Sequence, residues 1–531
     1  MNMKRASSRG NPVQLAAWLA LLVSLSGLRA AAAAGATDYY VDAVAGNDAN
    51  KGTNPDSAWR TLTKVNGTTF QPSDTILFKA GGAWDGQLWP KGSGAEGRPI
   101  RVGKYGSGAK PLIRGNGSVE DAVLLKNQEY WEIEDLEVTN SGTTKVIRRG
   151  IHLAVVNFGE AHHVVVRRMS VHDISGRDDS KENGGIIFSC EGKEKPSRFV
   201  DVLIENNEVY HADRNGISSW SDRWQRILWY PSLGVVVRGN KLRDIGGDGI
   251  MIAVTDGALL EHNVVAQANQ RSEGYNVAIW TWSADNSVVQ FNEAYGTKGQ
   301  RDGEGFDSDW NSRNTLIQYN YSHDNDGGFL LICDDGGQRT ADSAGNVGTI
   351  VRYNISQNDH HRGITFAGPV QNTLIYNNTI FIGTEETVDA ILFSDWDGWS
   401  RTTAFYNNIF YAEGKGTIGH AISRAPDGAH TSAPGLGESQ ENKFDGNVFF
   451  GHIAPEEDPH AMTANPGFVA RGKGKAGRET LKGYALRPES KARQSGIPVP
   501  GNGDKDFFGT TLEKCTAVDR GAVQSTPCGG Q

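Results

Sequence analysis

The chain is poor in cysteine, proline and methionine: its 531 residues include 4 Cys, 18 Pro and 5 Met. So few cysteines exclude a small scaffold held together by disulfides. Neither a CxxC motif nor a Cys/His cluster is present, so the sequence predicts no zinc site. After the N-terminal region, no apolar run reaches the roughly 18 residues that suggest a membrane-spanning helix. A hydrophobic content of 38% nevertheless excludes a disordered chain.

Basic residues are also scarce, since 53 Lys and Arg stand against 62 Asp and Glu and give a net charge of −9. We therefore expect no nucleic-acid partner. The acidic balance also disfavours a long polyanionic substrate, unless a metal or a local basic patch offsets it. Nothing in the composition calls for a partner chain, and we expect a monomer.

The first 36 residues have the pattern of a secretory signal peptide. Lys4 and Arg5 begin it, an apolar core follows over 15–28, and small residues offer a cleavage site at 34–36. The alternative is a membrane anchor, but the apolar core is short for a span. The sequence therefore predicts a secreted or periplasmic protein with no membrane attachment once the leader is removed.

The four cysteines fall into two pairs. Cys515 and Cys528 lie close together in the tail and can form a disulfide in an oxidising compartment. Cys190 and Cys333 lie about five repeat units apart. At about 4.8 Å per stacked strand, that is roughly 20 Å, which is beyond disulfide reach. We expect these two to be buried free thiols.

A repeated unit takes over from about residue 122. A β-rich run ends in Asn, a polar turn follows, and Gly then opens a second β-rich run. The recurring asparagines are Asn207, Asn240, Asn263, Asn292, Asn320, Asn354, Asn378 and Asn408. Repeats of about 23–34 residues are typical of a solenoid. Because the runs are short and Asn recurs at one turn, where stacked side chains can bond along the column, we predict a parallel β-helix. The alternative is a two-sheet sandwich.

The predicted fold class is all-β: a single-stranded right-handed parallel β-helix solenoid with an N-terminal cap and a C-terminal capping segment. The cap contains strands and a short helical stretch over 57–65, and it would cover backbone groups left open at the end of the solenoid. The predicted divisions are 1–36 (signal peptide), 37–121 (N-terminal cap and first coils), 122–455 (β-helix) and 456–531 (C-terminal capping segment).

The segment YYVDAVAGNDANKGTNPDSAW near the N-terminus and NPGFVA and GYALRPES near the C-terminus look like the capping segments of many exported β-helix proteins. With the repeats, they make the chain resemble the secreted right-handed parallel β-helix superfamily, the pectate lyase-like group that holds polysaccharide lyases and glycoside hydrolases. The resemblance implies a polysaccharide or oligosaccharide substrate, and it leaves the reaction open.

Carboxylates are crowded into about thirty residues: Glu304, Asp307, Asp309, Asp326, Asp334 and Asp335. Asp307 and Asp309 lie two apart on one predicted strand and so on one face. Crowded carboxylates raise one another's pKa, so one can stay protonated as an acid while another is ionised as a base. The same residues can instead bind Ca²⁺, with Asp307, Asp309 and Asp334 as ligands. Turn formation is the alternative role for Asp326, Asp334 and Asp335.

The outward face of the second strands follows from the residue after the recurring Gly, which is always apolar and is taken as inward. The predicted outward columns are Ser218, Met251, Trp280, Asp307, Leu330, Thr365 and Leu392, and then Trp220, Ala253, Trp282, Asp309, Ile332, Ala367 and Ser394. Trp220, Trp280 and Trp282 would line a sugar-binding groove with Trp310 and Trp396 at its edge. The alternative is that the insert 222–232 covers these rings as a second small core.

Three functions remain open. The order of acids on successive coils, with His361 and Arg362 one coil later, is similar to polygalacturonase-like hydrolases, although no Arg-x-Lys motif for galacturonate follows. This favours a glycoside hydrolase that uses acid and base carboxylates. A Ca-dependent polyuronate lyase is the second function, with Lys298, Arg301, His361 or Arg362 as base. A non-catalytic carbohydrate-binding solenoid is the third.

Overall fold

The computed structural model describes residues 35–422, 439–512 and 517–525. The predicted leader and the predicted Cys515–Cys528 pair lie outside these residues. Residues 36–531 form one compact unit. No helix within the described ranges is long and apolar enough to cross a membrane. Cys190 and Cys333 are buried free thiols, as predicted.

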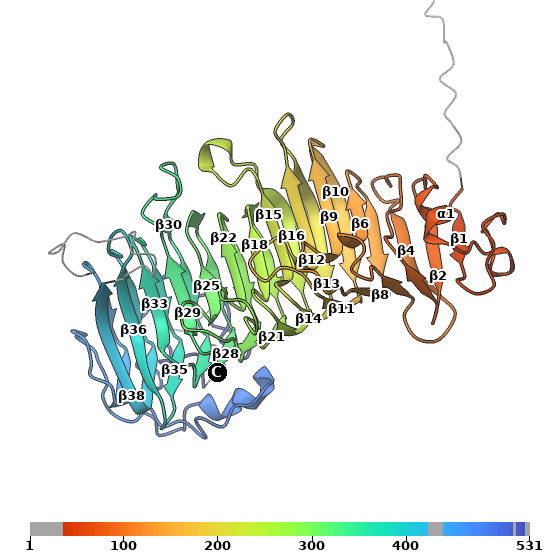
Figure 1. Cartoon of the computed structure of the whole chain (residues 1–531). Coiled ribbons are helices and arrows are strands. Elements are labelled where there is room, and N and C mark those ends of the chain that lie inside the picture. The colour runs from red at the N-terminus through yellow and green to blue at the C-terminus, as the bar shows by residue number, and fades with distance from the viewer. Residues whose placement is uncertain (1–34, 423–438, 513–516, 526–531) are drawn as a thin grey trace, which may run out of the picture. The chain divides into compact units, whose positions relative to one another are not determined.

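Three ladders of parallel strands build this unit, and the chain visits them in turn, once per coil (Figure 1). The first ladder consists of β1 (Asp38–Val41), β2 (Thr75–Lys79), β4 (Ile100–Tyr105), β7 (Trp131–Glu134), β10 (Glu160–Arg167), β13 (Arg198–Glu205), β16 (Ser232–Arg238), β20 (Leu259–Glu261), β23 (Val288–Gln290), β27 (Leu316–Gln318), β31 (Ile350–Arg352), β34 (Leu374–Tyr376), β37 (Ala404–Tyr406) and β39 (Lys443–Asp445).

The second ladder consists of β3 (Ala83–Asp85), β5 (Leu112–Arg114), β8 (Glu137–Asn140), β11 (Ser170–Ile174), β14 (Glu208–Ala212), β17 (Lys241–Ile245), β21 (Val264–Ala266), β24 (Glu293–Tyr295), β28 (Tyr321–His323), β32 (Ile355–Gln357), β35 (Thr379–Ile382), β38 (Ile409–Ile422) and β40 (Val448–His452). Outside the ladders, β19 (Thr255–Asp256) pairs with β16, and β26 (Ser312–Arg313) pairs with β30 (Asn346–Val347).

The third ladder consists of β6 (Asp121–Lys126), β9 (Arg149–Val156), β12 (Gly184–Glu191), β15 (Asn215–Ser221), β18 (Ile250–Ala253), β22 (Ile279–Trp282), β25 (Glu304–Ser308), β29 (Gly328–Cys333), β33 (Arg362–Ala367), β36 (Thr387–Asp395) and the second half of β38. Aliphatic and aromatic side chains from all three ladders fill the interior of the coils. The prediction of a right-handed parallel β-helix solenoid is confirmed.

A column of buried asparagines, the Asn column, marks the turn between the first and second ladders. Each side-chain oxygen accepts the backbone N–H and the side-chain NH₂ of the asparagine one coil earlier; for Asn292 and Asn263 the two distances are 2.9 and 3.0 Å. The NH₂ group of Asn292 also donates to the Leu260 carbonyl. The predicted members all take part, and the structure adds Asn447, whose NH₂ donates to Asp458.

Both ends of the solenoid are covered. Near the N-terminus lie the short helices η1 (Pro55–Ser57) and α1 (Leu62–Asn66), and the Thr61 hydroxyl caps α1 by accepting the Lys64 N–H. Near the C-terminus, the 3-10 helix η3 (Arg478–Tyr484) and its neighbours pack on the outer face of the second ladder, burying Tyr484 against Phe381. The C-terminal segment therefore covers the flank of several coils as well as the last one.

One predicted register is wrong by a residue. The predicted outward columns take Phe329, the residue after Gly328, as the inward residue that matches Phe306. In the structure, Phe306 pairs with Leu330, and Leu330 pairs with Ile364. Phe329 occupies the position that glycine fills in the adjacent coils, so Leu331 and Cys333 face outward in place of Leu330 and Ile332. Two consecutive glycines precede Phe329, which made the alignment ambiguous. The shift brings Cys333 beside Asp309.

Replacing Asn292 with Ala tests the Asn column. The change removes the acceptor of the Asn263 backbone N–H, one of the two acceptors of its NH₂ group, and a donor to the Leu260 carbonyl, all in a buried place. Each such group costs about 1–3 kcal/mol. We expect the free energy of unfolding in urea to fall by roughly 3 kcal/mol or more. Asn286→Gly, at an exposed turn whose left-handed backbone (φ 54°) suits glycine, should change it by less than about 1 kcal/mol; equal losses would contradict this role.

Candidate active site

The outer face of the third ladder carries the crowded carboxylates. Trp280 on β22 pairs with Asp307 on β25, and Asp307 pairs with Leu331 on β29. Asp309 follows β25 on the same face as Asp307, since side chains two residues apart point the same way. Asp302 and Glu304 lie just before the strand and at its start. We call Asp302, Glu304, Asp307 and Asp309 the carboxylate cluster.

Burial and mutual repulsion dominate the electrostatics of the carboxylate cluster. Glu304 and Asp307 are almost fully buried, at 0% and 3% exposure, whereas Asp302 and Asp309 keep part of their surface accessible. Desolvation, and then the charge of Glu304, hold the pKa of Asp302 well above its usual range. Desolvation, and then the charge of Asp309, do the same for the pKa of Asp307.

Asp309 differs because groups around it stabilise its anion. Burial raises its pKa, but the Cys333 thiol donates a hydrogen bond to Asp309 Oδ1 at 2.6 Å and counteracts that rise. The Trp310 backbone N–H donates to the same oxygen at 2.7 Å, and Arg339 adds a positive charge nearby. The pKa of both groups is raised, that of Asp302 well above its usual range, whereas hydrogen bonds to Asp309 work against the rise there. Asp309 is therefore the more readily ionised of two partly accessible carboxyl groups in one cluster.

Arg362 supports the cluster from the next coil. Its guanidinium forms an ion pair with Glu304 at 2.9 Å and donates to the carbonyls of Gln300, Arg301 and Asp302. The same side chain therefore compensates a buried charge and fixes the turn that carries Asp302. Arg362 was predicted as a catalytic or charge-neutralising group, and these contacts make it a positioning residue.

One wall of the site contains Lys181 and Asp248. Asp248 is fully buried and binds Lys181 at 2.8 Å and Arg214 at 3.0 Å. It also accepts a hydrogen bond from the Trp280 indole at 3.0 Å, while the Lys181 ammonium lies 4.4 Å from the ring centre. The positive charge of Lys181 lowers the pKa of the clustered aspartates, so it also faces the carboxylate cluster.

The insert 222–232, which includes η2 (Arg226–Leu228), forms the opposite wall. Trp224 packs on Trp282 and Trp310 with ring centres 6.3 and 5.5 Å apart. Arg226 crosses to Asp285 at 2.8 Å and donates to the side chain of Asn311. The alternative that this insert covers tryptophans thus holds for Trp282 and Trp310, and Trp280 is also buried, at 6% exposure.

Other predicted residues lie outside the cluster. Lys298 and His361 are exposed in turns, and Trp220 lies three coils from β25 along the ladder. Asp326 accepts the Gly299 N–H, Asp334 the Gly336 N–H, and Asp335 the Gly337 and Arg339 N–H groups, so these three aspartates shape turns. Trp396 meets the site through Arg339, which lies between its ring and that of Trp310.

The predicted Ca²⁺ ligands do not fit that ion together. Ligand atoms of Asp307, Asp309 and Cys333 lie within 4.8 Å of one another, and Asp334 is not in that group. The Asp334 carboxylate is held by backbone N–H groups of Gly336 and Asn346. Calcium takes six to eight oxygen ligands, whereas this group offers two carboxylates and a thiol.

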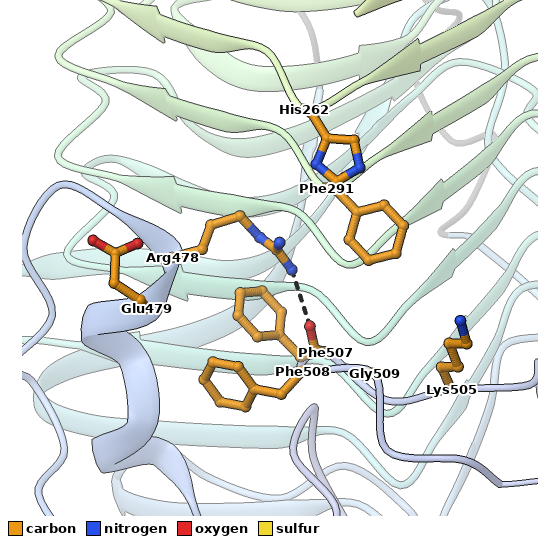
Figure 2. A pocket seen from close by; sticks show the side chains of 8 residues that line it. All are labelled: His262, Phe291, Arg478, Glu479, Lys505, Phe507, Phe508 and Gly509. Atoms are coloured by element: carbon orange, nitrogen blue, oxygen red, sulfur yellow. Dashed lines mark hydrogen bonds between the residues drawn. The ribbon is translucent and has the colours of Figure 1, made fainter. Parts of the chain in front are cut away.

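Two surface hollows lie apart from the carboxylate cluster. Figure 2 shows one of about 450 Å³ between the turn residues His262 and Phe291 and the C-terminal Arg478 and Phe507, with the Arg478 guanidinium donating to the Phe507 carbonyl. The second, of about 420 Å³, includes Tyr130. No member of the cluster lines either hollow.

Comparison with known proteins agrees with this architecture. A family described as "Right handed beta helix region" matches residues 200–380. A GH136 lacto-N-biosidase from Eubacterium ramulus superimposes with a TM-score of 0.58 at 24% identity, over 77% of this chain and 67% of that one. The chain shares the right-handed parallel β-helix fold of these proteins. A second structure, XylC with xylose, covers 93% of this chain and 99% of its own, with a TM-score of 0.54 and 12% identity.

A curated lacto-N-biosidase from Bifidobacterium longum is 27% identical over 609 residues, which cover 92% of this chain. The chain spans only 36% of the length of that relative. The similarity therefore extends over almost the whole of this β-helix protein and over about a third of the longer one.

Several residues of the site were missed in the sequence. Asp302 lies in the run RDGEG, two residues before Glu304, and its proximity to the other acids was the available signal. Lys181, Asp248 and Arg339 reach the site from other coils and loops, and no local pattern marks them. The predicted register differs by one residue at this coil and places Ile332, not Cys333, on the outward face.

Replacing Arg362 with Met tests its positioning role. The change leaves Glu304 buried without a counter-charge and releases the turn that carries Asp302. Breaking one side of a buried ion pair typically costs about 3–5 kcal/mol. We expect a loss of that size in the free energy of unfolding, whereas Arg401→Met, at an exposed site, should cost less than about 1 kcal/mol.

The double variant Arg362→Met with Glu304→Gln separates the ion pair from a general loss of packing. If the uncompensated charge causes the loss, the double variant recovers at least about 1 kcal/mol relative to the sum of the single changes. Additive losses would contradict the pairing.

Proposed function

We propose that this protein is a glycoside hydrolase that uses Asp302 as general acid and Asp309 as its ionised partner. The observation that carries the proposal is the contrast between these two accessible carboxyl groups in one buried cluster. Asp302 has anionic neighbours that favour its protonated form, and Asp309 accepts hydrogen bonds that favour its anion. Glycosidases need such a pair on the two sides of the scissile bond.

In this mechanism Asp302 donates its proton to the glycosidic oxygen as the leaving group departs. The Asp309 carboxylate faces the positive charge that develops at the anomeric carbon, and product stereochemistry reports whether it attacks that carbon or deprotonates a water. Asp307 and Glu304 are too buried to meet a sugar, and the charge of Glu304 raises the pKa of the acid. This revises the sequence-based pair, in which Asp307 was a leading candidate.

The proposed substrate is an oligosaccharide carrying a terminal lacto-N-biose unit, because 92% of the chain aligns with a lacto-N-biosidase at 27% identity. Lys181, the partly exposed Trp282 and the exposed Tyr275, whose carbonyl accepts from Lys181, offer polar and aromatic contacts to such a sugar. The proposal includes export, which is inferred from the leader pattern of residues 1–36. It also includes the predicted N-terminal cap and C-terminal capping segment on either side of the catalytic coils.

A lyase would need a basic group next to the carboxylates. The candidates do not offer a free one: Lys298 and His361 are exposed in turns, Arg362 is engaged with Glu304, and Lys181, which faces the cluster, is bound to Asp248. An assay that measures both reducing ends and ultraviolet absorbance tests this alternative. β-Elimination of a uronate would create a double bond that absorbs ultraviolet light, whereas hydrolysis yields reducing ends only.

Asp302→Asn and Asp309→Asn test the assignment. Both should lower kcat on a lacto-N-biose-containing oligosaccharide by about 10²–10⁴-fold, the usual contribution of an acid or base. On nitrophenyl lacto-N-bioside, whose leaving group needs no proton, Asp302→Asn should retain much more activity than Asp309→Asn. Asp326→Asn, which changes a turn outside the cluster, is the matched control and should stay within about threefold of the parent.

Equal losses for Asp302→Asn on both substrates would remove it as the acid, and full activity of Asp309→Asn would overturn the pair. Thermal unfolding of each variant shows whether the fold is kept. A protein that releases no reducing ends from any neutral oligosaccharide, while its unfolding is normal, contradicts the proposed function.

The pH profile gives an independent test through Cys333. Activity needs Asp309 ionised, so it falls as pH drops through the Asp309 pKa, and it needs Asp302 protonated, so it also falls as pH rises through the Asp302 pKa. The thiol hydrogen bond lowers the pKa of Asp309. Cys333→Ala should therefore move the acidic limb upward by about one pH unit and leave the alkaline limb in place.

Cys333→Ser keeps a donor at the same position and is the matched control. Its acidic limb should stay close to that of the parent. If Cys333→Ala shifted the alkaline limb instead, the assignment of Asp309 and Asp302 to the two limbs would be reversed.

A further inference from the structure

One part of the site has a composition that hydrolysis does not require: a thiol between two carboxylates. Ligand atoms of Asp307, Asp309 and Cys333 lie within 4.8 Å of one another. The two aspartates are two residues apart on one face, and the corrected register places Cys333 on the neighbouring strand, aligned with Asp309. Three side chains of a rigid sheet thus converge without any loop having to move.

Asp307 is the least satisfied member of this group. It is 3% exposed, and its Oδ1 is buried without a hydrogen-bond partner among the described residues. A buried carboxylate oxygen with no donor carries a cost of at least about 1–3 kcal/mol. Since a carboxylate oxygen of Asp307 lies within 4.8 Å of ligand atoms of Asp309 and Cys333, a ligand that provides positive charge there would relieve the cost.

The surrounding charge is also unbalanced. Glu304 forms an ion pair with Arg362, whereas Asp302, Asp307 and Asp309 form no ion pair among the described residues. The charges of Arg362, Arg339 and Lys181 offset them in part, but Arg362 and Lys181 are already bound to Glu304 and Asp248. Oxygen ligands alone would suit a hard cation. The thiol changes the preference, because thiolate with carboxylate favours zinc and similar softer ions over calcium or magnesium.

We propose that Asp307, Asp309 and Cys333 form a binding site for Zn²⁺, and that the bound ion inhibits the enzyme by occupying Asp309. Binding replaces the S–H bond of Cys333 with a metal–sulfur bond, and the thiol proton passes to solvent. Two carboxylate oxygens and a water complete four-coordination, with no change of oxidation state. Binding does not depend on the proposed function, whereas inhibition does.

Cobalt(II) serves as the spectroscopic probe of this site in the purified full-length protein. We expect thiolate-to-cobalt charge-transfer absorption in the near ultraviolet and the intense visible bands of four-coordinate Co²⁺. Both should disappear when Zn²⁺ is added and persist when Ca²⁺ is added. Cys333→Ser should lack the charge-transfer band, and Asp307→Asn should bind Co²⁺ at least tenfold more weakly.

Cys190→Ser is the matched control, because that buried thiol lies near Ser232 and no carboxylate ligand group includes it. It should leave the spectrum unchanged. A charge-transfer band that survives in Cys333→Ser, or its absence in the parent protein, overturns the proposal. Circular dichroism and thermal unfolding show whether each variant is folded. If Cys333→Ser does not fold, the weaker cobalt binding expected of Asp307→Asn still tests the site.

Inhibition is measured on the same preparations. Zn²⁺ should lower hydrolysis in the parent protein, and Cys333→Ser should need at least tenfold more Zn²⁺ for the same effect. A cobalt spectrum without any hydrolysis would retain the metal site and remove the proposed function. Hydrolysis without the cobalt spectrum would retain the proposed function and remove the metal site.

Discussion

The hydrogen bonds of the Asn column are the interaction on which the rest of the structure depends. A stack of coils must repeat one turn with the same backbone path, and the buried amides of that turn need partners. Asparagine provides both a donor and an acceptor, so each side chain satisfies its own coil and the one before it. Because strand registers follow from this turn, the positions of the outward residues on the third ladder follow as well.

The site uses that rigidity to hold like charges together. Four carboxyl groups within a span of eight residues would repel one another on a flexible loop, where they would separate. Here β25 and its flanking turns hold them, Arg362 compensates the most buried one, and the thiol and backbone donors favour ionisation at one end of the cluster. The fold therefore provides the electrostatic contrast on which the proposed acid and base roles depend.

Local patterns predicted the parts of the structure that repeat. The asparagines, the parallel β-helix and the outward position of Asp307 and Asp309 follow from periodicity, because each coil obeys the same alternation. The failures lie where a coil departs from its neighbours. Phe329 replaces a glycine and shifts the register, and Lys181, Asp248 and Arg339 meet the cluster only through stacking. The insert 222–232 gave no sign of which tryptophans it would cover, since that depends on the crossing of Arg226 to Asn311.

That crossing has a consequence for how the protein opens. In a solenoid, each coil contacts only its neighbours, so stability adds up coil by coil and unfolding can begin at either end. Arg226 joins a loop after β15 to residues that follow β22 and β25, and the N–H of Ile227 reaches Asp342, beyond β29. Coils that would open one at a time are thereby linked. Amide exchange across the strands that carry the carboxylate cluster should accordingly behave as one cooperative block, set apart from the coils at either end.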